Sequence, residues 1–174
     1  RGAEVTLVCG PIAPSLRTNR TDIIQVDVES AEEMYQACAK HYPSMDAGIL
    51  CAAVADFTPY NIADHKIKRE GDDMILRLKP TKDIAAELGK TKRKDQLLVG
   101  FALETNDETT NAHLKLAKKN FDFIVLNSLN DAGAGFQTDT NKISIITAKN
   151  KVDFPLKSKK EVARDIINQL VSLS

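Results

Sequence analysis

The sequence lacks an excess of charge of either sign. Its 174 residues include 24 Lys and Arg and 24 Asp and Glu, so the formal net charge at pH 7 is zero. Proteins that bind nucleic acid or membrane surfaces through their overall field carry excess positive charge, so we expect neither partner. No apolar run approaches the ~20 residues that span a bilayer, and no signal peptide precedes the first predicted strand. We therefore expect a cytoplasmic protein.

Cysteine is scarce, and the three that are present, Cys9, Cys38 and Cys51, are an odd number. Cys9 and Cys51 lie in predicted strands, and Cys38 lies on the apolar side of a predicted helix. This placement is typical of reduced core thiols in a cytosolic protein. The alternative that one of them is a nucleophile stays open.

Motifs of several common chemistries are missing. The phosphate loop GxxxxGK followed by Ser or Thr is absent, and so is the GxSxG elbow of hydrolases. The glycine spacing of a dinucleotide site is matched only at 133–135, where a strand rather than a helix follows. His41, His65 and His113 are scattered, and no Cys/His cluster has zinc spacing. We predict no metal site of the protein's own, and a surface position rather than a catalytic role for His65.

A βαβ unit organises the first third of the chain. It combines a strand over 23–28, a helix that begins at the capping box of Ser30 and Glu33, and an apolar strand over 47–55. The run 47–55 consists of small and β-branched residues, which is typical of a central parallel strand buried on both faces. It stops at Asp56, the first charge after nine uncharged residues.

The remaining pattern alternates strands and helices. Further strands are predicted at 5–9, 74–79, 97–102, 121–126, 143–147 and 152–154, and further helices at about 80–89, at about 105–119 and after the capping box of Ser158 and Glu161. We expect an α/β fold: one Rossmann-like layered domain over residues 1–174, with a mostly parallel central sheet and helices on both faces. A small antiparallel hairpin over 66–79 would extend from it.

Polar side chains follow the predicted strands at their carboxyl ends, where ligands bind in open α/β sheets. Asp56 comes directly after the strand 47–55, and a basic cluster with Lys66 and Lys68 follows. The same rim would hold Thr81, Lys82, Glu104, Asn106 and Asn127. Lysines there could neutralise a triphosphate, and a carboxylate could hold Mg²⁺ or a ribose hydroxyl. We predict a phosphate-handling domain in which Asp56 and Lys66 converge with the turn at Thr81; the alternative is an ordinary strand exit with a solvated loop.

The sequence resembles phosphopantothenate–cysteine ligase in five segments that follow one another in that family's order: AAVADFTPYNIADHKIKR, LKPTKDI, VGFALETN, IVLNSL and AGAGFQTDTN. In bacteria this enzyme usually forms the C-terminal half of a bifunctional coenzyme A biosynthesis protein, fused to a flavin-dependent decarboxylase. The resemblance implies that the carboxylate of 4′-phosphopantothenate attacks the α-phosphate of CTP and releases pyrophosphate. The amine of cysteine then attacks the acyl-cytidylate, giving phosphopantothenoylcysteine and CMP.

The resemblance also implies residue roles. Lys66 matches the family's essential lysine and would act on the phosphates and the acyl nucleotide as the catalytic residue. Phe101 would pack near the base, unless it is plain core packing, and Lys115 would contact a phosphate. The other implied nucleotide-binding residues are Cys51, Ala52, Ala53, Asp56, Lys79, Pro80, Thr81 and Lys82. Mg²⁺ would arrive with CTP, FMN would serve only an attached decarboxylase half, and the chain would form a homodimer with active sites near the interface.

One segment of the family pattern is not in the chain. A glycine- and serine-rich turn with an asparagine that acts on the acyl nucleotide would precede Arg1. We therefore expect these 174 residues alone to bind nucleotide weakly and to turn over poorly. Two other functions stay open, a nicotinamide-linked oxidoreductase and a non-catalytic nucleotide-binding or interaction module. The sequence does not distinguish CTP from ATP, or show whether a decarboxylase half is attached.

Overall fold

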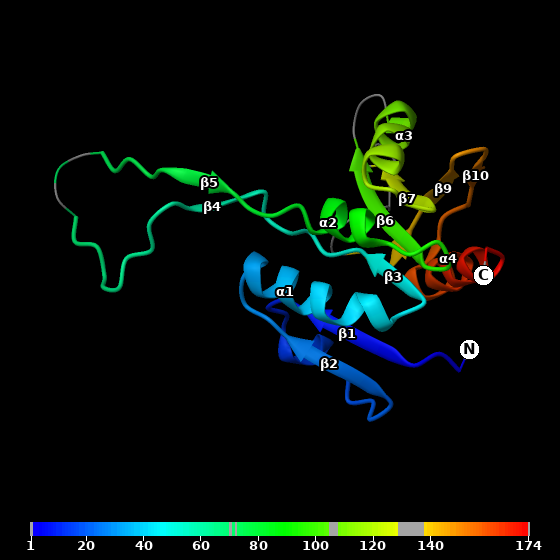
Figure 1. Cartoon of the computed structure of the whole chain (residues 1–174), viewed down its shortest axis with the longest axis horizontal. Coiled ribbons are helices and arrows are strands. Elements are labelled where there is room, and N and C mark those ends of the chain that lie inside the picture. The colour runs from blue at the N-terminus through cyan, green and yellow to red at the C-terminus, as the bar shows by residue number, and fades with distance from the viewer. Residues whose placement is uncertain (1, 70, 72, 105–107, 129–137, 174) are drawn as a thin grey trace. The chain divides into compact units, whose positions relative to one another are not determined.

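A computed structural model describes residues 2–69, 71, 73–104, 108–128 and 138–173 (Figure 1). The chain divides into two compact units, each made of two stretches of sequence. Unit 1 contains residues 1–37 and 52–83, and unit 2 contains residues 38–51 and 84–174. The expectation of one domain over the whole chain stays a prediction.

Unit 1 begins with two parallel strands, β1 (Val5–Cys9) and β2 (Ile23–Asp27), with the short 3-10 helix η1 (Pro14–Leu16) between them. The helix α1 (Ala31–His41) follows and continues into unit 2. At its start the Ser30 hydroxyl accepts from the Glu33 N–H (3.2 Å), and the Glu33 carboxylate accepts from the Glu29 N–H (2.7 Å). Hydrogen bonds from the backbone of Glu29 and then of Ser30 lower the pKa of Glu33, as the predicted capping box implies.

The rest of unit 1 is a long hairpin over residues 57–80, which we call the arm (Figure 1). Its strands β4 (Phe57–Pro59) and β5 (Leu78–Pro80) pair antiparallel, with Phe57 opposite Pro80. The predicted strand 74–79 and the predicted hairpin 66–79 are therefore wrong in extent, because β5 pairs with a strand that lies before residue 66. Residues 74–76 are apolar but exposed, and without a surface to cover they form no strand.

Unit 2 is built on a five-stranded sheet of order β10-β9-β7-β6-β3. Its strands are β3 (Ala47–Leu50), β6 (Leu97–Glu104), β7 (Phe123–Ser128), β9 (Ile143–Thr147) and β10 (Lys151–Asp153). The strands β3, β6 and β7 are parallel, whereas β9 and β10 run antiparallel to their neighbours. Unit 2 also contains η2 (Tyr42–Ser44), α2 (Ile84–Thr91), α3 (Glu108–Lys118), β8 (Thr140–Asn141), β11 (Lys157–Ser158) and α4 (Lys159–Val171).

The predicted central strand 47–55 is corrected by this topology. Only residues 47–50 form a strand, and β3 lies at the edge of its sheet. After Leu50, which pairs with Gly100, the chain leaves the ladder and enters unit 1. The strand at the centre is β7, whose Phe123 and Val125 have no exposed surface.

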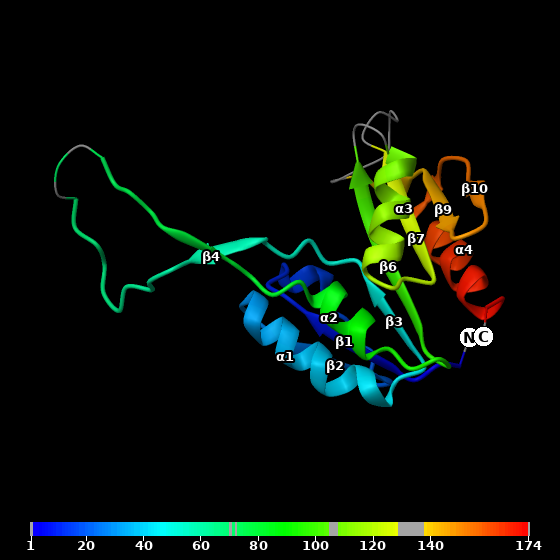
Figure 2. The ribbon, with the colours of Figure 1, turned by 45° about the horizontal axis from the view of Figure 1, so that its top comes forward.

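Helices cover both faces of this sheet, as the sequence predicts. Successive side chains of a strand point to opposite faces. Phe123 and Val125 of β7 pack in one core cluster with Val162 and Ile166 of α4. The helix α3 contacts β6, β7 and β9 and buries Ala112, and Figure 2 shows α3 and α4 on opposite sides of the strands. The α/β fold with a mostly parallel central sheet and antiparallel extensions is confirmed.

The helix ends follow local rules. The predicted capping box of α4 is confirmed, because the Ser158 hydroxyl accepts from the Glu161 N–H (3.3 Å) while the Glu161 carboxylate accepts from the Ser158 N–H (3.0 Å). After α3, Asn120 adopts the left-handed φ of 53°. The Phe121 N–H then donates to the Leu116 carbonyl (3.0 Å), which closes the helix in a Schellman turn. The Asn120 amide also donates to the Gly89 carbonyl of α2 (2.9 Å).

Gln96, Lys92 and Asp122 of unit 2 pair their polar groups across elements, whereas the buried Tyr42 hydroxyl has no hydrogen-bond partner among the described residues. The Gln96 amide donates to the carbonyls of Tyr42 (2.8 Å) and Met45 (2.7 Å). The Lys92 ammonium contacts both Asp122 carboxylate oxygens (2.9 and 3.0 Å), and the Leu98 N–H donates to the same carboxylate (2.6 Å). Burial, together with the nearby Asp122 charge, raises the pKa of Tyr42 to about 12. These contacts fix the start of β6 against β7 and η2.

We predict that Gly89→Ala destabilises the protein. Alanine normally favours a helix by about 1 kcal/mol over glycine. A Cβ at Gly89, however, would lie 2.0 Å from the Lys119 carbonyl oxygen, which is backbone and cannot turn away. Equilibrium urea unfolding should show a free energy of unfolding lower by about 1–3 kcal/mol. The control is Gly10→Ala, whose new Cβ would make an ordinary 3.6 Å contact with Met34, and a gain in stability at Gly89 would contradict the close approach.

We also predict that Asp122→Asn destabilises unit 2, because it leaves the Lys92 ammonium, whose side chain is 10% exposed, without a counter-charge. The expected loss is about 2 kcal/mol in the free energy of unfolding, below the roughly 3–5 kcal/mol of a fully buried pair. Asp95→Asn, which breaks the exposed pair with Arg93, is the control and should change little. Equal losses in the two variants would show that burial of the Lys92 pair is unimportant.

Candidate functional site

Thr81 joins two of the segments that carry the family resemblance. Its backbone N–H donates to the Asp56 carbonyl (2.9 Å), and its hydroxyl donates to the Ala55 carbonyl (2.7 Å). We call this pair of hydrogen bonds the Thr81 clamp. It holds the segment after β3 against the turn after β5, as the sequence predicts for Asp56 and Thr81. The Thr81 hydroxyl proton is used in this hydrogen bond, so the side chain holds the two segments together. Its predicted contact with nucleotide stays a prediction.

The clamped segment presents small and acidic groups. Ala52, Ala53 and Asp56 are exposed and lie outside regular secondary structure. Methyl side chains let a ligand approach the backbone closely, and the Asp56 carboxylate can accept from ribose hydroxyls or meet a cation. Cys51 comes just before this segment in the sequence and belongs to unit 2. It is exposed as well, so its prediction as a core thiol is wrong. Cys9 and Cys38 are half-buried.

Lys82 is held by α1 in unit 1. Its ammonium lies 3.0 Å from a Glu32 carboxylate oxygen and 4.2 Å from the centre of the Tyr35 ring. The Gln36 amide donates to the same Glu32 oxygen (2.7 Å). The hydrogen bonds from Gln36 and then from Lys82 lower the pKa of Glu32. Sequence analysis missed Glu32 and Tyr35, although their separation of three residues on one helix signals a shared face.

Lys79 and Pro80 lie in β5 of the arm, opposite Thr58 and Phe57. The Lys79 ammonium lies 5.6 Å from the centre of the Tyr60 ring, and the Arg77 guanidinium lies 5.2 Å from it. The Tyr60 N–H donates to the Arg77 carbonyl (2.9 Å), which continues the β4–β5 ladder by one pair. Tyr60 and Arg77 were not predicted, because their proximity follows from the register of the hairpin.

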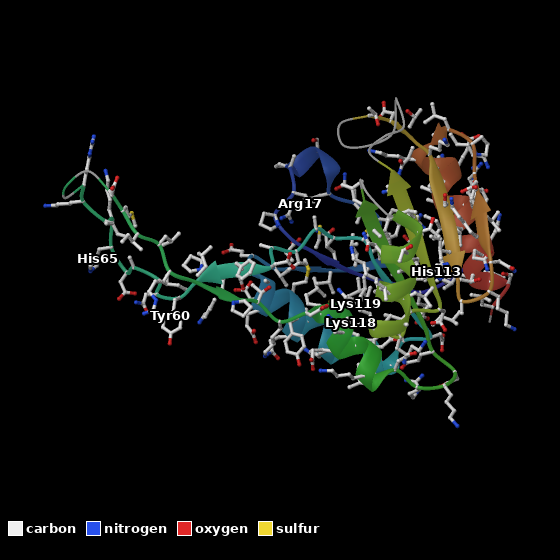
Figure 3. All side chains as sticks on the ribbon, turned by 90° about the horizontal axis from the view of Figure 1, so that it is seen from above. Arg17, Tyr60, His65, His113, Lys118 and Lys119 are labelled. Carbon is white, nitrogen blue, oxygen red and sulfur yellow. The ribbon has the colours of Figure 1, made fainter. Side chains whose placement is uncertain are left out.

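Lys66 is not brought to Asp56 and Thr81, so the predicted convergence of the three is wrong within one chain. The clamp lies at one end of the paired strands β4 and β5, and Lys66 lies in the exposed loop at the other end. Figure 3 shows His65, its neighbour in sequence, far along the arm beyond Tyr60. The antiparallel pairing leads the chain away from the clamp, which the sequence spacing of ten residues does not reveal.

The remaining predicted contacts belong to unit 2. Phe101 lies in β6 opposite Val125 and packs against the core cluster. This supports the alternative prediction that the Phe101 side chain is part of the core. Lys115 is half-buried on α3. Asn127, at the end of β7, accepts from the Asn141 amide (3.2 Å). Asn106, the Glu104 side chain and the glycines at 133–135 lie outside what the structure describes.

Across the described residues, no group of three or more His, Cys, Asp or Glu side chains is arranged to hold a metal ion. None of the helices in this same part of the chain has the length and apolar character needed to cross a membrane.

Comparison with known proteins places this geometry in a family. The family described as DNA/pantothenate metabolism flavoprotein, C-terminal domain, matches residues 1–173. A protein from an unknown prokaryotic organism named cysteine/cysteine sulfinic acid decarboxylase is 57% identical over 99% of this chain and 48% of its own length. The coenzyme A biosynthesis bifunctional protein CoaBC of Bacillus subtilis is 42% identical over 99% of this chain and 42% of its own length. The chain thus spans about half of these relatives or less.

Solved structures with a similar fold include relatives of the same kind. The crystal structure of a CoaBC C-terminal domain has a TM-score of 0.79 and 38% identity, and the match covers 99% of this chain and 77% of that one. A Cab2 variant in complex with phosphopantothenate-cysteine has a TM-score of 0.60 at 19% identity, covers 77% of this chain and 47% of that one, and shows likeness of fold alone. The chain therefore belongs to the family of DNA/pantothenate metabolism flavoprotein C-terminal domains.

Proposed function

We propose that the chain is a phosphopantothenate–cysteine ligase domain that makes phosphopantothenoylcysteine for coenzyme A biosynthesis in the cytoplasm. The observation that carries the proposal is the Thr81 clamp, because it joins the AAVADF and KPTK segments of the ligase resemblance. The likeness to CoaBC of B. subtilis along 99% of the chain supports it.

The proposed reaction uses CTP in two steps. The carboxylate of 4′-phosphopantothenate attacks the α-phosphate and pyrophosphate leaves; the amine of cysteine then displaces CMP from the acyl-cytidylate. Cations are needed where the pyrophosphate charge develops, and a unit charge pair ~4 Å apart is worth about 4 kcal/mol at an effective dielectric of 20. Lys82, Lys79, Lys66 and Lys115 are our proposed phosphate contacts, and Phe101 is our proposed contact with the base.

Magnesium and flavin have different places in this proposal. We propose that Mg²⁺ arrives with CTP, where the exposed Asp56 carboxylate suits it as an oxygen ligand. FMN would serve only a decarboxylase half joined to this domain.

A second candidate is a non-catalytic nucleotide-binding module. One observation favours it: the relative that is 57% identical is named for decarboxylation and not for ligation. In such a module, Lys66→Ala would leave nucleotide affinity unchanged, and no pyrophosphate would form from CTP, 4′-phosphopantothenate and cysteine.

The proposal predicts selective stabilisation by CTP. A ligand that binds only the folded state stabilises it by about 2.7 kcal/mol at a hundredfold excess over its Kd. In a thermal unfolding assay with Mg²⁺, CTP should raise the midpoint more than ATP, and NADH should leave it unchanged. Lys82→Met and Lys66→Ala should reduce the CTP shift, whereas Lys94→Ala, which removes an exposed lysine of unit 2, should not. A larger shift with NADH than with CTP would favour the nicotinamide-linked alternative.

We further propose a homodimer in which the arm packs against a second copy. The arm carries Ile62, Met74 and Ile75 at 85%, 65% and 91% exposure, an apolar surface that a partner would cover. Lys66 lies in the same arm and away from its own Asp56, so a second copy could receive it. Active sites near the interface would follow from that arrangement.

This proposal predicts that Ile75→Lys converts the protein to a monomer, measured as mass by light scattering after size exclusion. Leu114→Lys, which alters an exposed apolar residue on α3 at 64% exposure, should stay dimeric. If Lys66 acts in the partner's site, mixing Lys66→Ala with Asp56→Asn protein should restore part of the pyrophosphate release that each lacks alone. Dimers in both lysine variants would refute the arm as the interface.

A further inference from the structure

The Lys82 side chain is fixed at both of its ends. The Thr81 clamp holds the neighbouring backbone, and α1 holds the ammonium. A lysine on a surface usually samples many rotamers, so a lysine that must meet a phosphate loses that freedom on binding. Restraint before binding removes part of this cost.

The groups that hold the ammonium come from one face of α1. Glu32 and Tyr35 are three residues apart, and Gln36 is four residues after Glu32, so their side chains are neighbours on the helix. The ring of Tyr35 lies 4.2 Å from the Lys82 ammonium, within the range of a cation–π contact. Gln36 holds the Glu32 carboxylate through a 2.7 Å hydrogen bond, which fixes the second partner of the lysine.

The arrangement leaves the ammonium able to bind a ligand. An ammonium has three donors, and Glu32 takes one of them at 3.0 Å. The face of an aromatic ring attracts the charge without using a directed donor. The Lys82 side chain is 49% exposed, so phosphate oxygens can reach the other donors from solvent.

We propose that Tyr35 and Glu32 are positioning residues for Lys82, which set its ammonium for the phosphates of the nucleotide. This inference rests on the proposed nucleotide site. It extends that site to α1, a helix in which sequence analysis placed no functional residue.

A double-mutant cycle with Mg²⁺-CTP tests the proposal. Tyr35→Leu removes the ring but keeps an apolar side chain, and it should weaken CTP binding about two- to fivefold, the size of an exposed cation–π contact. Tyr35→Phe keeps the ring and should bind as the wild type does. In a Lys82→Met background, Tyr35→Leu should have no further effect. An equal loss in both backgrounds, or a loss in Tyr35→Phe, would overturn the positioning role.

A second measurement without nucleotide separates this proposal from the proposed function. The ring current of Tyr35 should shift the NMR signals of the Lys82 methylene next to the ammonium. Tyr35→Leu should abolish that shift, and Glu32→Gln should reduce it, while Lys94 signals serve as an internal reference. If the wild type does not bind CTP, the nucleotide site alone is refuted. If its Lys82 signal is unshifted, the contact with α1 is refuted.

Discussion

Two hydrogen bonds from one residue organise the candidate site. Thr81 is anchored to the carbonyls of Asp56 and Ala55, twenty-five and twenty-six positions earlier in the chain. They extend the contact between the two ends of the arm beyond the last ladder pair, Phe57 with Pro80, and fix the backbone next to Lys82. A threonine suits this place because one short side chain can add a hydroxyl donor beside its own N–H.

Local signals were sufficient where the fold depends on short-range chemistry. The strand over 143–147 has the predicted bounds, and Ser158 and Glu161 form the complete box that their spacing implies. The alternation of apolar segments also predicts helices on both faces of the sheet, because a central apolar strand such as β7 buries both of its sides. The resemblance to a family added the expected substrates, because spacing alone left several phosphate-handling functions open.

Non-local pairing is where sequence reasoning failed. The run 47–55 has the composition of a central strand, yet the ladder with β6 ends at Leu50, and no local feature marks that point. Residues 74–76 look like a strand, but a strand needs a surface to cover, and the arm offers none to them within unit 1. The separation of Lys66 from Asp56 follows from the pairing of Phe57 with Pro80, which depends on residues distant in sequence.

The two units differ in the interactions that stabilise them. Unit 2 contains nearly all of the buried apolar side chains that the structure describes, and in unit 1 Val28 is the buried apolar residue among those described. Unit 1 is instead held by strand pairing, the Thr81 clamp and surface ion pairs, which individually contribute little in water. Segments with few buried contacts lie at the low end of local stability, and ligand-binding elements are commonly drawn from that end. Because Asp56, Lys66, Lys79 and Lys82 all lie in unit 1, binding a nucleotide there would stabilise the part of the protein that its own core supports least.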